Sequence, residues 1–138
     1  MKLTKLILLL CLLPFYASAE ALTDRQRINQ VMDSFYQWDH TGGTHNAENS
    51  LAHTVRYNRL DEGGKHIAYS IDFNYEGKGK NAYQYFIAGL DIYGKMAVVR
   101  SIHYHAGKGS YLKTFILHKL TQGWRITNVS WGKITPEE

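Results

Sequence analysis

Seven polar or aromatic positions in the second half of the chain could together hold a small molecule. They are Asp91, Arg100, Lys113, Asn128, Tyr85, Tyr104 and Tyr111. A buried charge needs a partner, so Asp91 and Arg100 are expected to pair, which leaves Lys113 for an anionic or aromatic molecule. The alternative is that this face is partly exposed and its charges are solvated.

An acid/base pair could form where the first predicted helix ends. Asp39 and His40 stand there, and His53 follows at the start of an extended segment. A carboxylate and an imidazole can share proton transfer, with Tyr57 or Tyr111 as proton donor. Adjacent helical residues point about 100° apart, so Asp39 and His40 are not expected to face one pocket. We therefore favour a simpler role for His40, in which it complements the helix dipole.

Two histidines have the spacing of metal ligands on one strand. His103 and His105 are two residues apart and so share a face. His118 is predicted to pair with Ala97, too far along the strand to join them. We expect the two histidines to be exposed at the strand end, and we predict no metal site and no cofactor.

The elements that would position these residues begin with a helix. Thr23 is the candidate N-cap with Gln26 as its capping-box partner. An apolar stripe then predicts an amphipathic helix from about 24 to 39. It consists of Ile28, Val31, Met32, Phe35 and Trp38. Residues 45–52 are predicted to form a short helix and 55–60 an extended segment, whereas 65–73 fit either a strand or a third short helix.

Four apolar, tyrosine-rich stretches between residues 83 and 134 predict a β-meander. Loop length fixes hairpin register. Turns at 94–95, 106–109 and 122–123 place the charged and tyrosine side chains on one face. The other face carries an aliphatic row of Leu90, Val99, Ile116 and Val129. We expect the helices to cover the charged face and a second subunit to cover the aliphatic face.

The first 19 residues have the features of a signal peptide. Two lysines precede an apolar run at 6–13, and Ala17-Ser18-Ala19 supplies the small residues for cleavage after Ala19. The run is too short for a stable membrane anchor. Cleavage removes Cys11, the single cysteine, and two of the 16 basic residues, leaving 14 against 12 acidic ones. We expect one exported domain, residues 20–138, periplasmic or secreted from a bacterium, without the basic patch that nucleic acids require.

Three motifs of the meander resemble the lumazine-binding-like family of the nuclear transport factor 2-like superfamily. They are Gly94-Lys95-Met96-Ala97-Val98-Val99, then Gly109-Ser110-Tyr111 with Phe115, Leu117 and Lys119, then Gly123-Trp124-Arg125-Ile126 with Asn128. The resemblance implies a cone in which three helices pack on a strongly bent antiparallel sheet, with a pocket between them. It also implies a dimer through the outer face of the sheet. Lys113 stands where that family usually has an aspartate, so the family's ligand chemistry is not carried over.

The sequence therefore predicts an α+β fold, a curved antiparallel sheet with N-terminal helices, that binds a small molecule and forms a homodimer. Two other functions stay open. One is a small lyase or isomerase with His53 or Asp39 as base, which the superfamily resemblance permits. The other is a protein-interaction module of the cell envelope, acting through the aliphatic face.

Overall fold

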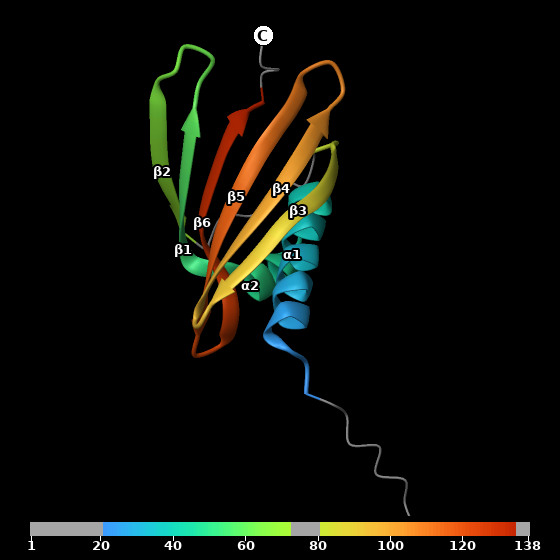
Figure 1. Cartoon of the computed structure of the whole chain (residues 1–138), viewed down its shortest axis with the longest axis vertical. Coiled ribbons are helices and arrows are strands. Elements are labelled where there is room, and N and C mark those ends of the chain that lie inside the picture. Colours follow the sequence, from blue (N-terminus) through green and yellow to red (C-terminus); the bar gives the residue numbers. More distant parts are fainter. Residues whose placement is uncertain (1–20, 73–80, 135–138) are drawn as a thin grey trace, which may run out of the picture.

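The computed structural model describes residues 21–72 and 81–134. The predicted signal peptide, part of the segment between the second and third strands, and the last four residues lie outside these ranges. The described chain forms an α+β fold in which two helices pack against one face of a curved, open, six-stranded sheet (Figure 1). None of the helices within these ranges is long and apolar enough to cross a membrane.

Helix α1 (Asp24–Thr41) begins and ends at local sequence features. The capping box is confirmed: the Thr23 side chain accepts from the Gln26 N–H at 3.2 Å, and the Gln26 side chain accepts from the Thr23 N–H at 2.8 Å. Gly42 ends the helix with a positive φ of 78°, a conformation that favours glycine, and donates its N–H to the Trp38 carbonyl at 2.7 Å. Helix α2 (Thr44–Ser50) follows directly.

The six strands form a mixed sheet. They are β1 (Leu51–Leu60), β2 (His66–Asp72), β3 (Gln84–Tyr93), β4 (Met96–His105), β5 (Gly109–Leu120) and β6 (Gly123–Lys133), in the order β2-β1-β6-β5-β4-β3. The predicted meander of β3 to β6 is confirmed, and the ambiguous segment at 65–73 is strand β2. The sheet is not purely antiparallel, because β1 runs parallel to β6. The described residues also form two helices rather than the three that the resemblance implied.

The predicted register was wrong at β5, which is shifted by one residue. The turn between β4 and β5 holds three residues, 106–108, so His105 pairs with Gly109 and Val99 pairs with Phe115 instead of Ile116. The pairing of His118 moves likewise from Ala97 to Met96. Since side chains alternate along a strand, a shift of one residue moves every β5 side chain to the opposite face.

A bulge in β3 also moves the side chains in the first half of this strand to the opposite face of the sheet. The register shifts between Ile87 and Gly89, so Tyr85 pairs with His103 rather than with Tyr104. Tyr85, Tyr111 and Lys113 consequently lie on the face that the helices cover. The assignment of faces was therefore also wrong: the helices cover the row of Val99, Phe115 and Val129, which are buried, and not the face of Arg100.

The core lies between the helices and this face. The apolar stripe of α1 is buried as predicted, and Phe35 packs edge-on against Phe115 with ring centroids 5.0 Å apart. Trp124 at the start of β6 donates its indole N–H to Asp24 at 3.0 Å, which holds the first turn of α1 against the sheet. The hairpin of β1 and β2 extends away from the helices, at the upper left of Figure 1.

Candidate functional site

A group of polar and aromatic side chains gathers on the helix-covered face near the end of α1. We call it the Lys113 cluster, and it consists of Asp39, His40, Tyr83, His103, His105 and Lys113. Helix α1 supplies the first two, Tyr83 directly precedes β3, and the remaining three come from β4 and β5. The corrected register brings these strand residues to one side, because Lys113 pairs with Ser101 and His103 with Tyr111.

Lys113 is an enclosed ammonium group. Its side chain is 17% exposed, and its Nζ lies 5.5–5.9 Å from the ring centroids of Phe35, Tyr83 and Trp131. The nearest carboxylate oxygen is Asp39 Oδ2 at 3.9 Å, and Nζ makes no hydrogen bond within the described ranges. Burial lowers the pKa of Lys113, and the charge of Asp39 offsets part of that effect.

Asp39 is held by two hydrogen-bond donors. The Asn81 side chain donates to Oδ1 at 2.9 Å, and the Tyr83 hydroxyl donates to Oδ2. Burial, followed by the negative charge of Asp39, raises the pKa of Tyr83. His40 packs edge-on against the same Tyr83 ring, with centroids 4.5 Å apart. Asp39 and His40 therefore both contact Tyr83, the first at its hydroxyl and the second at its ring, although adjacent helical residues point in different directions.

His103 is fully buried, contrary to the expected exposure at the strand end. Its Nε2 lies 2.9 Å from the Tyr36 hydroxyl, and the Tyr83 ring stacks on it at 4.5 Å. Burial lowers its pKa to about 3, and the positive charge of Lys113 acts in the same direction. Its Nδ1 and the Nε2 of His40 are buried without a hydrogen-bond partner among the described residues.

A cavity of about 640 Å³ is lined by two aromatic residues that contact the cluster, Tyr111 and Trp131. It lies between the turn after β1, at Asp61 and Glu62, the start of β5, at Tyr111, and the end of β6, at Trp131. Trp131 is also one of the rings around Lys113, and Tyr111 packs edge-on against His105 at 5.3 Å. These two aromatic side chains therefore stand between the cavity and the charged part of the site.

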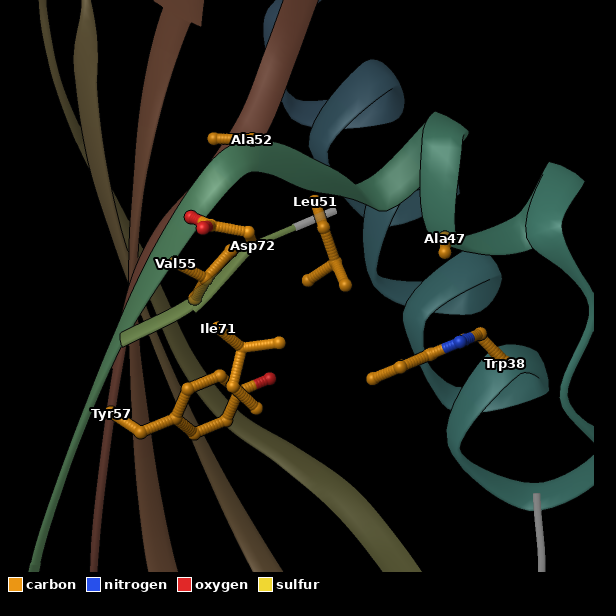
Figure 2. A pocket seen from close by; sticks show the side chains of 8 residues that line it. All are labelled: Trp38, Ala47, Leu51, Ala52, Val55, Tyr57, Ile71 and Asp72. Carbon is orange, nitrogen blue, oxygen red and sulfur yellow. The ribbon is translucent and has the colours of Figure 1, made fainter. Parts of the chain in front are cut away.

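A second, apolar pocket lies between the two helices and β1 (Figure 2). In Figure 2, Tyr57 and Ile71 lie on one side of it and Trp38 lies on the other. Its volume is about 10 Å³, the space of a single water molecule, so it is a packing defect rather than a ligand site.

The structure divides the predicted ligand-binding residues between the two faces. Lys113, Tyr85 and Tyr111 lie on the helix-covered face, where Tyr85 stacks on Tyr36 with centroids 3.5 Å apart. Four others lie on the outer face: Asp91, Arg100, Tyr104 and Asn128. The ion pair of Asp91 and Arg100 is confirmed at 2.9 Å, but both side chains are about half exposed, so it was not predicted correctly as a buried pair.

The predicted acid/base residues are also separated. Asp39 belongs to the Lys113 cluster, and its hydrogen-bond donors are Asn81 and Tyr83 rather than His53, which is exposed on β1. Tyr57 is buried and stacks on Tyr69 with centroids 5.4 Å apart. Within the described ranges, no group of three histidine, cysteine or carboxylate side chains is arranged to hold a metal ion.

Sequence reasoning missed Tyr36 and Tyr83 as parts of the site, and it favoured for His40 only a role at the helix dipole. Tyr36 lies beside the apolar stripe of α1 and carries a hydroxyl into the core, where it contacts Ser101 and His103. Tyr36 could have been found as a buried phenol that needs a partner. Tyr83 could not, because its place depends on the chain path into β3.

Comparison with known proteins identifies the fold. No protein-family model and no curated protein matches the sequence. An NTF2-like protein of unknown function from Shewanella baltica has a similar structure, with a TM-score of 0.66 and 15% identity over 85% of this chain and 100% of that one. Another from Methylobacillus flagellatus has a TM-score of 0.63 and 18% identity, covering 83% and 95%. A candidate dehydratase of the NTF2-like family from Streptomyces avermitilis has a TM-score of 0.55 and 13% identity, covering 82% and 97%. The chain has the nuclear transport factor 2-like (NTF2-like) fold.

Proposed function

We propose that the protein binds a small anionic molecule, with an aromatic portion, at the Lys113 cluster. One observation carries the proposal: a lysine ammonium enclosed by three aromatic rings makes no hydrogen bond to a described residue. An ammonium group has three N–H donors, and leaving them unpaired in a buried site is costly. A ligand carboxylate or phosphate would supply the acceptors.

The surroundings of Lys113 suit such a ligand. The rings of Phe35, Tyr83 and Trp131 limit access of water, which strengthens the attraction between opposite charges. The same rings offer flat apolar surface to an aromatic portion of the ligand. On the other side of Trp131 and Tyr111 lies the cavity of about 640 Å³, which is of the size that small-molecule sites usually have.

Binding of benzoate, measured by calorimetry, tests the proposal. We expect Lys113→Met to weaken benzoate binding by roughly ten- to a hundredfold, the usual value of a hydrogen bond to a charged group. Lys95→Met is the matched control, because Lys95 is exposed in the turn between β3 and β4. Equal affinity of both variants for benzoate, or no binding to the unaltered protein, would contradict the proposed site.

The second candidate function is a small lyase or isomerase, and the contact of Asp39 with Tyr83 favours it. A carboxylate and a phenol in one partly buried site could serve as base and acid. In this version Tyr83 replaces Tyr57 and Tyr111 as the proton donor. The test is turnover of small cyclic ketones and alcohols by the unaltered protein and by Asp39→Asn. The enzyme function is supported only if the unaltered protein turns over one of these substrates and Asp39→Asn is folded but inactive.

Export, homodimer formation and membership in the lumazine-binding-like family remain proposals. For a homodimer, the supporting feature is an apolar row across the outer face formed by Phe86, Ile102 and Leu112. Phe86 is 60% exposed, more than a large apolar side chain usually is. We expect Ile102→Lys, at the middle of the row, to convert a dimer to a monomer in sedimentation. A monomeric unaltered protein would remove this proposal.

A further inference from the structure

A chain of hydrogen bonds runs from the backbone of β3 through α1 to His103. The Ser101 hydroxyl donates to the Phe86 carbonyl at 3.0 Å, and the Tyr36 hydroxyl donates to Ser101 Oγ at 2.7 Å. Tyr36 Oη also lies 2.9 Å from His103 Nε2. We propose that this chain fixes His103 as the neutral Nε2–H tautomer, and that its Nδ1 accepts a hydrogen bond from the molecule that Lys113 binds. The second half of this inference rests on the proposed function.

The number of available protons determines the tautomer. A carbonyl oxygen only accepts, so the single hydroxyl proton of Ser101 belongs to the contact with Phe86. Ser101 Oγ must then accept from Tyr36, which uses the single hydroxyl proton of that tyrosine. The contact between Tyr36 and His103 needs a proton too, and only Nε2–H can provide it. In this arrangement all three contacts are satisfied, and Nδ1 keeps its lone pair.

The surroundings of His103 disfavour a second proton on the ring. Lys113, His105 and His40 are the charged or titratable groups that lower its pKa, after burial itself. The phenols of Tyr36 and Tyr83 touch the ring and are neutral near pH 7, because burial raises the pKa of both. Asp39 belongs to the same cluster, but its carboxylate is already engaged by Tyr83 and Asn81.

In this tautomer Nδ1 carries no proton, so it can only accept a hydrogen bond. Tyr83 stacks on the face of the imidazole, with 20° between the planes, whereas the Nδ1 lone pair lies in the plane of the ring. Stacking does not supply a donor to this lone pair, which has no hydrogen-bond partner among the described residues, and a buried unpaired acceptor is destabilising. His103 and Lys113 are diagonal neighbours on adjacent strands, so one small molecule can contact both. We infer that the ligand carries an O–H or N–H donor in addition to its anionic group.

The tautomer can be read directly, without any ligand. Two-bond nitrogen–proton correlation spectra of the protein labelled with ¹⁵N-histidine distinguish Nε2–H from Nδ1–H. We expect His103 to show the Nε2–H pattern, unchanged between pH 5 and pH 8. Tyr36→Phe, which removes the acceptor for Nε2–H, should shift the pattern toward a mixture of tautomers, whereas Tyr93→Phe on the exposed surface should not. An Nδ1–H tautomer, or titration of His103 within this range, would overturn the inference.

The donor preference is tested with matched probes. Each hydroxybenzoate is compared with the corresponding fluorobenzoate, because fluorine is close to a hydroxyl in size but cannot donate. We expect at least one hydroxybenzoate to bind roughly two- to tenfold more tightly than its fluoro counterpart. His103→Phe should abolish this preference, and His103→Asn, which keeps a polar side chain that can accept at a similar position, should retain part of it.

The outcomes separate the two proposals. If all these probes bind through Lys113 and the hydroxyl preference survives in His103→Phe, the role of His103 is wrong and the proposed function stands. If the unaltered protein shows no preference for hydroxybenzoates, the role of His103 is likewise wrong and the proposed function stands. If no probe binds, the proposed function and the ligand contact at Nδ1 are both overturned, while the spectra still decide the tautomer.

Discussion

The ion pair of Lys113 and Asp39 gives the sharpest test of the site, because its strength depends on how well the cluster excludes water. The two side chains are 17% and 14% exposed, and their charges are 3.9 Å apart. At the effective dielectric constant of about 20 that suits such positions, two unit charges at this distance attract by about 4 kcal/mol. In bulk water the same pair would gain only about 1 kcal/mol.

A double-mutant cycle measures this interaction. Lys113→Met and Asp39→Asn each leave one enclosed charge without its partner, so each should lower the free energy of unfolding by about 3 kcal/mol. The double variant removes both charges and should cost much less than the two losses together. We expect a coupling energy of about 2–4 kcal/mol from urea unfolding at pH 7.

The exposed pair on the outer face supplies the control. Arg100 and Asp91 approach more closely, to 2.9 Å, but both are about half exposed. The cycle of Arg100→Met and Asp91→Asn should give a coupling energy below about 1 kcal/mol. If the Lys113 pair gives no more than the Arg100 pair, then Lys113 is solvated and the reasoning behind the ligand site is refuted.

Three further predictions concern the elements that build the site. Thr23→Ala should lower the free energy of unfolding by about 1 kcal/mol in urea, because it breaks the capping box; no loss would mean that the first turn of α1 is held by other contacts. Tyr36→Phe should cost about 1–3 kcal/mol in the same assay, since Ser101 and His103 each lose a buried partner, and Tyr93→Phe should change stability by less than about 0.5 kcal/mol. The pKa of His103 falls from 6.5 to about 3 on folding, so the unfolded chain binds the extra proton and stability is lost as the pH drops from about 6.5 toward 3. Over that interval His103→Phe should show a flatter stability curve than the unaltered protein, and parallel curves would contradict a buried neutral histidine.

Features set by neighbouring residues could be predicted from the sequence. The capping box needs only Thr23 and Gln26, three positions apart, and both contacts are present. The apolar stripe of α1 and the order of the meander strands are equally local. The Asp91–Arg100 pair was also predicted, because the register between β3 and β4 beyond the bulge is as expected.

Features that depend on one residue more or less in a turn or a strand could not be predicted. A turn of four residues in place of three between β4 and β5 would look almost the same in sequence, yet it decides which face carries Lys113. The bulge between Ile87 and Gly89 has the same effect on Tyr85 and has no distinct sequence feature. The sequence therefore predicted one face for seven residues that the structure divides between two. The Lys113 cluster emerges only when Tyr83, which directly precedes β3, is placed beside His40 and Asp39.

The position of β6 has a consequence for how the chain reaches its native state. This last strand pairs with β1 on one side and with β5 on the other, so it separates the early hairpin from the rest of the sheet. During synthesis, β1 cannot pair with β6 until the last described strand has left the ribosome. Pairings between such distant parts of a chain slow folding. Loss of β6 would divide the sheet into two smaller sheets, β2-β1 and β5-β4-β3. Each would have an additional edge strand with unpaired backbone groups, which favours self-association.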